Sequence, residues 1–216
     1  MNLLNQIVLG DCADVLKGVP DGGVDLVLTS PPYDELAFRR TWSFDVVARE
    51  LARVLKPGGV VVWVVADQFI EGSETCVGMR QALHFRMLGL NLYETMVLEY
   101  TAGAGLRGAH GPYLQTWDYM FCFAKGRPRT FHRGAHRTNL WRFPCEEHRF
   151  DPPLAMPEQL AVDHVETWTD EGDIVLDPFC GTGTVCVAAK RLGRNFIGIE
   201  IDRDCYRVAL DRVESA

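Results

Sequence analysis

Short apolar runs alternate with amphipathic stretches along almost the whole chain. The runs are rich in valine, isoleucine and leucine and have the length of buried strands, whereas the stretches between them repeat apolar residues at helical spacing. We expect strands at 5–9, 24–29, 60–66, 92–99, 117–124, 173–177 and 195–201. Strands that alternate with helices predict an α/β fold with a doubly wound, mostly parallel sheet.

Three of the intervening helices carry an apolar stripe that we expect to face the core. Ser43 can cap the first helix, and Lys56-Pro57-Gly58-Gly59 would end it. The stripes are Phe44, Val47, Leu51 and Val54 in this helix; Cys76, Met79, Leu83 and Met87 in a helix after Ser73; and Ala161, Val165 and Trp168 in a helix after Pro157.

The size of the chain predicts a single domain over residues 1–216. Its 216 residues, 47% of them hydrophobic, suffice for one sizeable core. The apolar runs are too short to span a membrane, and the first residues lack the basic start of a signal peptide. We therefore expect a cytoplasmic protein without a membrane partner.

Cysteine usage indicates a reducing environment. The chain has seven cysteines, an odd number, and no CxxC pair, so we expect reduced and mostly buried thiols. One cluster leaves a zinc site open as an alternative, because His132 and His136 have a spacing seen in some zinc sites. The partners of this pair would be Cys145 and His148, which lack the usual spacing, so we expect no metal.

The charge of the chain is unevenly distributed. The net charge of −7 disfavours a nucleic-acid partner, but residues 125–149 hold seven basic residues against two glutamates, a local balance of +5. Phe131, Trp141 and Phe143 lie in the same segment, and basic with aromatic residues suit phosphate contact and base stacking. The candidate DNA contacts are Arg127, Arg129, Arg133, Arg137 and Arg142.

The first candidate site is the pentapeptide TSPPY at 29–33, which directly follows the strand predicted at 24–29. Pro31 and Pro32 have no backbone N–H, so nearby carbonyls are free to accept hydrogen bonds from a ligand, and Tyr33 offers a flat aromatic face. This combination suits a planar heterocycle with an exocyclic amine. The alternative is a turn that ends a strand, or a polyproline ligand for another domain.

The second candidate site is the glycine turn after the strand at 173–177. The sequence Asp177-Pro178-Phe179-Cys180-Gly181-Thr182-Gly183-Thr184 opens a helix, and the next strand ends at Glu200. A carboxylate in that position can accept from both hydroxyls of a ribose. The third glycine of the dinucleotide fingerprint is replaced by Cys186 and the phosphate-loop lysine is absent, so S-adenosylmethionine fits better than a phosphorylated ligand. A purely structural turn is the alternative.

Together the two candidate sites resemble the motifs of a known family. The chain resembles the permuted DNA methyltransferases that modify N4 of cytosine or N6 of adenine, in which the catalytic motif precedes the cofactor motif. The resemblance covers nearly the whole chain and rests on TSPPY, the helix-KPGG-strand of 44–65, WDYMFCFAKG at 117–126, MPEQLA at 156–161, DPFCGTGT at 177–184 and GIEID at 198–202. It implies a Rossmann-like fold that binds S-adenosylmethionine.

The resemblance also implies roles for individual residues. The catalytic pocket would consist of Ser30, Pro31, Pro32 and Tyr33. The cofactor would be bound by Asp11 and Cys12 near its adenine, by Glu200 at its ribose, by Asp177, Pro178, Phe179, Gly181, Gly183 and Thr184 in the glycine turn, and by Pro157 at its methionine end. Asp202 is a further cofactor-binding candidate. Family members commonly carry a histidine shortly before Met156, where this chain has Pro152-Pro153, and His148 is a candidate substitute.

The implied activity is methylation of a flipped base in double-stranded DNA, with residues 101–150 as the target-recognition segment. In this family, serine at the first motif position accompanies cytosine N4 more often than adenine N6, so Ser30 favours cytosine. A cognate restriction endonuclease, and a monomeric or homodimeric state, stay open. Alternatives are cytosine C5 chemistry at Cys145, an RNA or protein amine as substrate, and a non-catalytic DNA-binding protein of the same fold.

Overall fold

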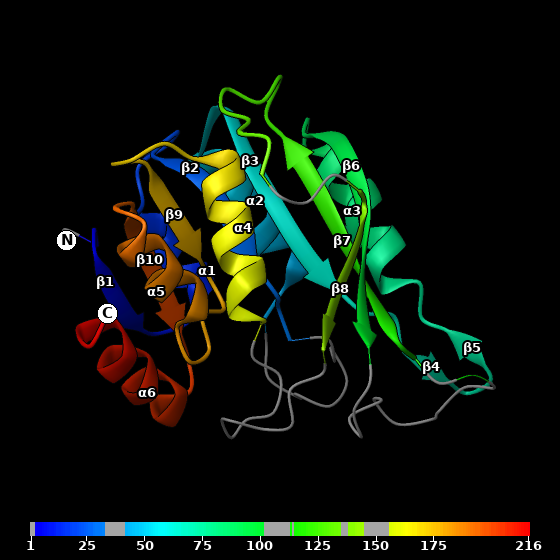
Figure 1. The fold of residues 1–216 in the computed structure, drawn as a ribbon. Coiled ribbons are helices and arrows are strands. Elements are labelled where there is room, and N and C mark those ends of the chain that lie inside the picture. Colours follow the sequence, from blue (N-terminus) through cyan, green and yellow to red (C-terminus); the bar gives the residue numbers. More distant parts are fainter. Residues whose placement is uncertain (1–2, 33–41, 102–112, 114, 135–137, 145–155) are drawn as a thin grey trace.

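The computed structural model describes residues 3–32, 42–101, 113, 115–134, 138–144 and 156–216. In this part of the chain an eight-stranded sheet forms in the order β1-β10-β9-β2-β3-β7-β6-β8 (Figure 1). The strands are β1 (Gln6–Leu9), β2 (Val24–Thr29), β3 (Leu55–Val65), β6 (Asn91–Thr101), β7 (Trp117–Ala124), β8 (Leu140–Pro144), β9 (Ile174–Asp177) and β10 (Asn195–Glu200). β7 runs antiparallel to its neighbours β3 and β6, whereas the other neighbouring strands pair in parallel.

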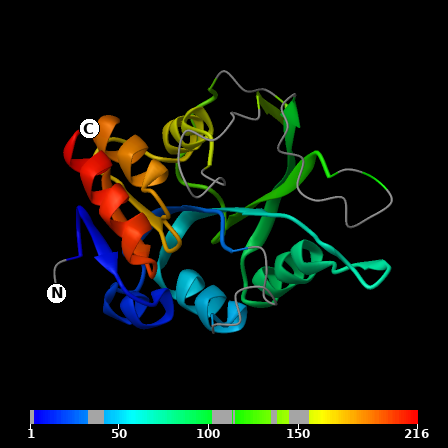
Figure 2. The ribbon, with the colours of Figure 1, turned by 90° about the horizontal axis from the view of Figure 1, so that it is seen from below.

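Helices cover both faces of the sheet, which confirms the doubly wound α/β fold. One face packs against α1 (Cys12–Val15), the short 3₁₀ helix η1 (Leu16–Gly18), α2 (Phe44–Val54) and α3 (Val77–Met87). The other face packs against α4 (Glu158–Trp168), α5 (Thr184–Arg191) and α6 (Arg203–Glu214). Figure 2 shows the two helical layers on opposite sides of the sheet.

All seven predicted strands are present, with shifts of their ends, and three features were not predicted. β3 begins at Leu55, so the Lys56-Pro57-Gly58-Gly59 segment lies inside the strand, at an irregularity in its pairing with β2. β8 adds an outer strand beside β6. A small hairpin of β4 (Phe69–Ile70) and β5 (Ser73–Glu74) also forms.

The predicted core stripe of α3 is wrong. Met79, Leu83 and Met87 are 44%, 64% and 83% exposed, and Cys76 lies before the helix in the solvent. The buried face instead holds Val77, Gly78, Gln81, Ala82 and Phe85. In α2 and α4, by contrast, Val47, Leu51 and Val54, and Ala161, Val165 and Trp168, face the core as predicted.

A polar residue explains the different rotation of α3. Gln81 is buried because its Oε1 accepts a hydrogen bond from Trp63 Nε1 at 2.8 Å, which satisfies both groups inside the core. Phe85 packs against Phe44, Trp63 and Phe123 in the same layer. A prediction that counts only apolar residues leaves out Gln81. It therefore assigned the wrong face of α3 to the core.

The order of the strands reverses between β9 and β2. The chain continues from β2 to β3 on one side and from β9 to β10 on the other, and the carboxyl ends of these four parallel strands lie at one edge, the lower side of Figure 1. We call it the carboxyl edge, and the opposite one the amino edge. In open α/β sheets ligands bind beyond the carboxyl ends at such a reversal.

The helices of the described residues include none that is long and apolar enough to cross a membrane.

Candidate active site

The two predicted motifs lie side by side at the carboxyl edge. β2 pairs with β9 through Leu26 with Val175 and Val27 with Leu176. Beyond these pairs the hydroxyl of Thr29 donates to Asp177 Oδ1 at 2.7 Å, and both residues are buried. The segment that starts at Ser30 and the turn that starts at Pro178 therefore leave the sheet next to each other, as the strand positions predicted.

The TSPPY motif is described as far as Pro32. Ser30 and Pro32 are half-buried, and Pro31 is buried at the end of β2. Tyr33 lies outside the described residues, so its predicted stacking on a base stays a prediction.

The glycine turn adopts a compact conformation that needs its glycines. Gly181 and Gly183 have φ values of 51° and 83°, in the left-handed region that favours glycine. A Cβ on Gly183 would lie 3.0 Å from the Cβ of Ala209 on α6. Cys180 N donates to Ile199 O at 2.9 Å, which fastens the turn to β10, and α5 begins at Thr184.

Glu200 holds the turn from the end of β10. Its Oε2 accepts from the N–H of Gly181 and its Oε1 from the N–H of Asp202, both at 2.8 Å. Each carboxylate oxygen has a second lone pair, so Glu200 keeps capacity to accept from a ligand. Ile201, the next residue, is 66% exposed beside it and offers an apolar surface that the sequence reasoning missed.

Asp11 and Asp202 have capping roles. Asp11 Oδ1 accepts from Ala13 N at 2.8 Å at the start of α1, and Asp202 Oδ1 accepts from Asp204 N and Cys205 N at the start of α6. These bonds to backbone N–H groups hold the pKa of Asp202 below its usual value. Both carboxylates are thus engaged by the protein, and contact with a cofactor stays a prediction for each.

Two buried groups at this edge have raised pKa values. Burial raises the pKa of Asp177 to about 7, although hydrogen bonds from Thr29 and Phe179 N oppose the shift. Burial, with the nearby charge of Asp11, raises the pKa of Cys12 to about 12, so its thiol is protonated at neutral pH. Cys12 is next to the site because Gly10 N donates to Glu200 O at 2.8 Å.

Pro157 caps α4 at the carboxyl edge. The following residue, Glu158, forms an ion pair with Arg191 at the end of α5, which connects this segment to the helix that follows the glycine turn. Pro157 is therefore on the side of the sheet where the resemblance expects the methionine end of the cofactor.

Two further residues at the site were not found from the sequence. Trp42 packs edge-on against Phe179 with ring centroids 4.9 Å apart. Arg212 of α6 donates from Nη1 to Thr182 O, Thr182 Oγ1 and Thr184 Oγ1 at 2.8, 3.0 and 3.1 Å. Trp42 had a signal, because an apolar residue just before a helix cap often packs against neighbouring apolar groups. Arg212 had none, since arginines are common on exposed helix faces.

The predicted DNA contacts do not gather at the site. Residues 125–132 run along the amino edge, where Arg129 N donates to Gly58 O and His132 N to Thr167 O. Arg127 and Arg133, in and next to this stretch, are exposed. Arg142 is exposed on β8 and pairs with Glu99 at 2.6 Å. Arg137 lies outside the described residues.

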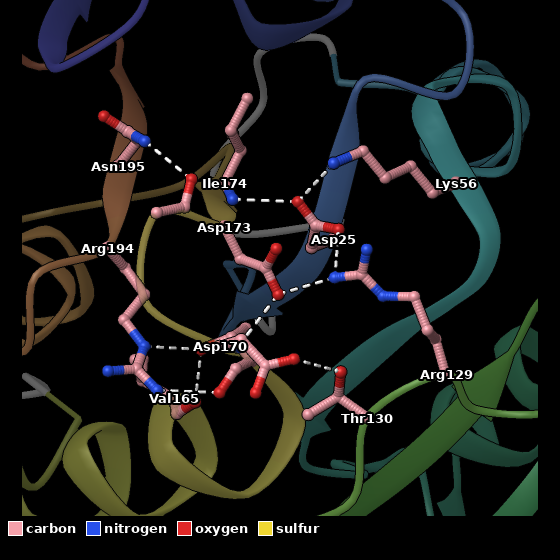
Figure 3. A network of polar contacts seen from close by, with 12 residues as sticks. Asp25, Lys56, Arg129, Thr130, Val165, Asp170, Asp173, Ile174, Arg194 and Asn195 are labelled. Atoms are coloured by element: carbon pink, nitrogen blue, oxygen red, sulfur yellow. Dashed lines mark hydrogen bonds and ion pairs between the residues drawn. The ribbon is translucent and has the colours of Figure 1, made fainter.

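Arg129 forms ion pairs within the protein, and its predicted contact with DNA stays a prediction. Its guanidinium donates to Asp25 Oδ1 at 2.9 Å and to Asp173 Oδ2 at 2.7 Å, as Figure 3 shows. These ion pairs join the beginnings of β2 and β9, and the hydrogen bond to Asp173 raises the pKa of Arg129 further. Two carboxylates thus balance its charge, although its side chain is 50% exposed.

The zinc alternative finds no support in the described residues. His132 Nε2 lies 2.8 Å from Asp170 Oδ1, and this contact lowers the pKa of Asp170. His136, Cys145 and His148 lie outside the described residues. Within the described ranges, histidine, cysteine and acidic side chains form no group of three or more that could hold a metal.

Comparison with known proteins identifies relatives that are DNA methyltransferases. The orphan methyltransferase M.BamHII of Bacillus amyloliquefaciens is 36% identical to this chain, and the match covers 92% of each protein. TTHA0409 of Thermus thermophilus, described as a candidate DNA modification methylase and solved in complex with S-adenosyl-L-methionine, is 26% identical. It superposes with a TM-score of 0.74 over 97% of this chain and 94% of its own.

A third protein extends the likeness of the fold. The cytosine-N4-specific PvuII DNA methyltransferase superposes with a TM-score of 0.82 over 96% of this chain and 85% of its own, at 18% identity. Residues 24–211 match the model of the N6/N4 DNA methylases, which spans both motifs at the carboxyl edge. The chain therefore belongs to the N6/N4 family of DNA methylases.

Proposed function

We propose that this chain transfers the methyl group of S-adenosylmethionine to the exocyclic amine of a flipped base in double-stranded DNA, with N4 of cytosine favoured over N6 of adenine. The observation that supports it is the hydrogen bond between Thr29 and Asp177, because it brings the Ser30-Pro31-Pro32 segment beside the glycine turn. An amine and a methyl donor must meet at such a junction.

The residues at the glycine turn fit the cofactor. Gly181 leaves the backbone open to close approach, because a Cβ there would meet nothing within 4 Å, and Glu200 offers acceptor oxygens that suit ribose hydroxyls rather than a phosphate. The other contacts would come from Asp177, Pro178, Phe179 and Thr184, from Asp11, Cys12 and Asp202, and from Pro157. When bound, S-adenosylmethionine supplies a methyl group that its sulfonium already activates.

The catalytic motif would prepare the amine. The lone pair of an exocyclic amine is delocalised into the base, so the amine is a poor nucleophile. The Ser30 hydroxyl and the Pro31 carbonyl would accept its two hydrogens, which favours a pyramidal nitrogen with its lone pair directed at the methyl. Tyr33 would stack on the base and offset part of the cost of flipping.

The choice of cytosine depends on Ser30 and needs a direct test. Cytosine and adenine present an amine beside a ring acceptor in the same way, so the pocket alone serves both. Mass spectrometry of nucleosides from duplex DNA treated with the protein should detect N4-methylcytosine. N6-methyladenine would reassign the base, and 5-methylcytosine lost on a Cys145→Ser change would replace the mechanism with C5 chemistry.

Predictions about partners and location belong to the same proposal. M.HpaI of Haemophilus parainfluenzae is named a type II methyltransferase and M.BamHII an orphan one. Relatives of this chain therefore include enzymes of both names. For this chain we predict a cytoplasmic location and a monomeric or homodimeric state. A cognate restriction endonuclease is a further predicted partner. Sedimentation with and without duplex DNA tests the oligomeric state.

A further inference from the structure

The seam between β2 and β9 is where the two halves of the sheet meet. β3 supports β2 as far as Thr29, and β10 supports β9 as far as Asp177. The pairing of β2 with β9 itself stops at Val27 and Leu176. The strands that carry the two motifs are therefore backed on their outer sides to their ends but are not paired with each other there.

Side chains bridge this seam at both of its ends. At the amino edge the buried Asp25 accepts from Ile174 N at 2.9 Å and pairs with Arg129, which also binds Asp173 (Figure 3). At the carboxyl edge a polar bridge runs from the Thr29 hydroxyl to Asp177 Oδ1 at 2.7 Å.

The carboxyl-edge bridge reaches both motifs through a single oxygen. Asp177 Oδ1 accepts from the Thr29 hydroxyl and also from Phe179 N at 3.1 Å, the first N–H of the turn because Pro178 has none. Thr29 immediately precedes Ser30. The last residue before the catalytic motif and the first donor of the cofactor turn are thus tied to the same atom.

We propose that Thr29 is a positioning residue for methyl transfer, whose hydrogen bond to Asp177 sets the spacing between the amine pocket and the cofactor turn. The proposal rests on the proposed function. In-line transfer tolerates little misplacement, and a shift of about 1 Å can cost about 100-fold in rate. Threonine suits this role because its β-branched side chain has few rotamers, which holds the hydroxyl in place.

The buried carboxyl of Asp177 argues against simple packing. Its raised pKa shows that the carboxyl is costly to keep ionised in the core. An apolar pair would fill the seam without that cost, whereas a directional hydrogen bond fixes the separation of two strand ends.

A matched pair of threonines allows a sharp experiment. Thr130 is also buried, and its hydroxyl donates to Asp170 at 2.9 Å, but it lies at the amino edge. Thr29→Val and Thr130→Val make the same isosteric change, and Thr29→Ser keeps the hydroxyl. For each variant we would measure kcat and KM for S-adenosylmethionine and DNA, cofactor Kd by calorimetry, and the melting temperature.

The positioning role predicts that Thr29→Val lowers kcat but leaves substrate and cofactor binding nearly unchanged. Thr29→Val should lower kcat about 10- to 100-fold, with cofactor Kd and both KM values within about threefold of wild type. Thr29→Ser should restore kcat to within about threefold, and Thr130→Val should lower the melting temperature but leave kcat unchanged.

Other outcomes overturn the proposal or its basis. A Thr29→Val protein with wild-type kcat, or an equal loss of kcat in Thr130→Val, contradicts the positioning role and leaves the proposed function intact. If Thr29→Val does not fold, a kcat more than about tenfold low in folded Thr29→Ser contradicts it instead. No transfer to DNA by the wild type contradicts the proposed function, and this inference with it.

Discussion

At the scale of single residues, buried carboxylates hold the two motifs in register. Asp25 joins the beginnings of β2 and β9, and Asp177 joins their ends to the glycine turn. The sequence alone predicted that Asp177 belongs to a ligand site, but it gave Asp25 no role. A lone aspartate inside an apolar strand carries no signal for its partners, because Ile174 and Arg129 are distant along the chain.

The raised pKa of Asp177 predicts a pH dependence of stability. The carboxyl has a pKa of about 7 when folded and an ordinary value of 3.8, so the folded state binds the proton more tightly. The stability that this group contributes is fully present below about pH 4 and is lost as the pH rises towards about 7. Asp177→Asn mimics the protonated carboxyl and should become progressively more stable than wild type over this range, by at most about 1.4 kcal/mol per pH unit.

Urea denaturation of both proteins at a series of pH values measures this difference. Asp211→Asn, an exposed change on α6, is the control that should show no such trend. A difference between Asp177→Asn and wild type that is constant from about pH 4 to about pH 8 would contradict the burial of a neutral carboxyl.

At the scale of elements, α6 supports the glycine turn. Arg212 binds Thr182 and Thr184, and Ala209 of the same helix packs where a side chain on Gly183 would lie. Arg212→Ala should weaken cofactor binding by about tenfold, because charge-assisted hydrogen bonds contribute about 1.5–3 kcal/mol each and part of that orders the turn. Calorimetric titration with S-adenosylmethionine measures it.

Arg207 provides the matched control on the same helix. Its ion pair with Asp204 is exposed and i,i+3, so Arg207→Ala should leave the affinity for the cofactor unchanged. Equal affinities for the two variants would show that α6 does not order the turn.

The rotation of α3 gives a second prediction at this scale. Phe85→Ala should lower the free energy of unfolding by about 3–5 kcal/mol, since it removes a buried ring. Leu83→Lys, on the face first expected in the core, should change it by less than about 0.5 kcal/mol. Urea titrations of both variants decide which face is buried, and a reversed order of the two effects would restore the original stripe.

The elements show where sequence patterns succeed and fail. Seven of the eight strands of the sheet and both motif turns were predictable, because apolar runs, prolines and glycines depend on local chemistry. The α3 face was not, since Gln81 becomes a core residue only through its bond to Trp63. β8 was overlooked although buried Trp141 and Phe143 flank exposed Arg142, a period of two that a mostly polar segment obscured.

At the scale of the whole molecule, the two edges of the sheet have different tasks. The carboxyl edge holds the motifs of the proposed site, whereas the amino edge is closed by ion pairs of Arg129 with Asp25 and Asp173 and by a hydrogen bond from Thr130 to Asp170 (Figure 3). The local charge count did not distinguish the two edges. A basic segment shows neither which edge of the sheet it will occupy nor which carboxylates will pair with it. The acidic partners of Arg129, Asp25 and Asp173, lie 104 and 44 residues away in the sequence.

This division predicts that two arginines of the same segment differ in their effect on stability. Arg129→Ala should lower the free energy of unfolding by about 1–3 kcal/mol, because it leaves the buried Asp25 with one donor fewer. The affinity for DNA should stay within about twofold, and the dependence of log Kd on log salt should keep its slope, whereas loss of a phosphate contact lowers that slope by about one. Arg127→Ala, exposed on the same edge, should leave stability unchanged and serves as the control. A shallower salt slope in Arg129→Ala with unchanged stability would instead return this residue to the DNA interface and make the amino edge part of it.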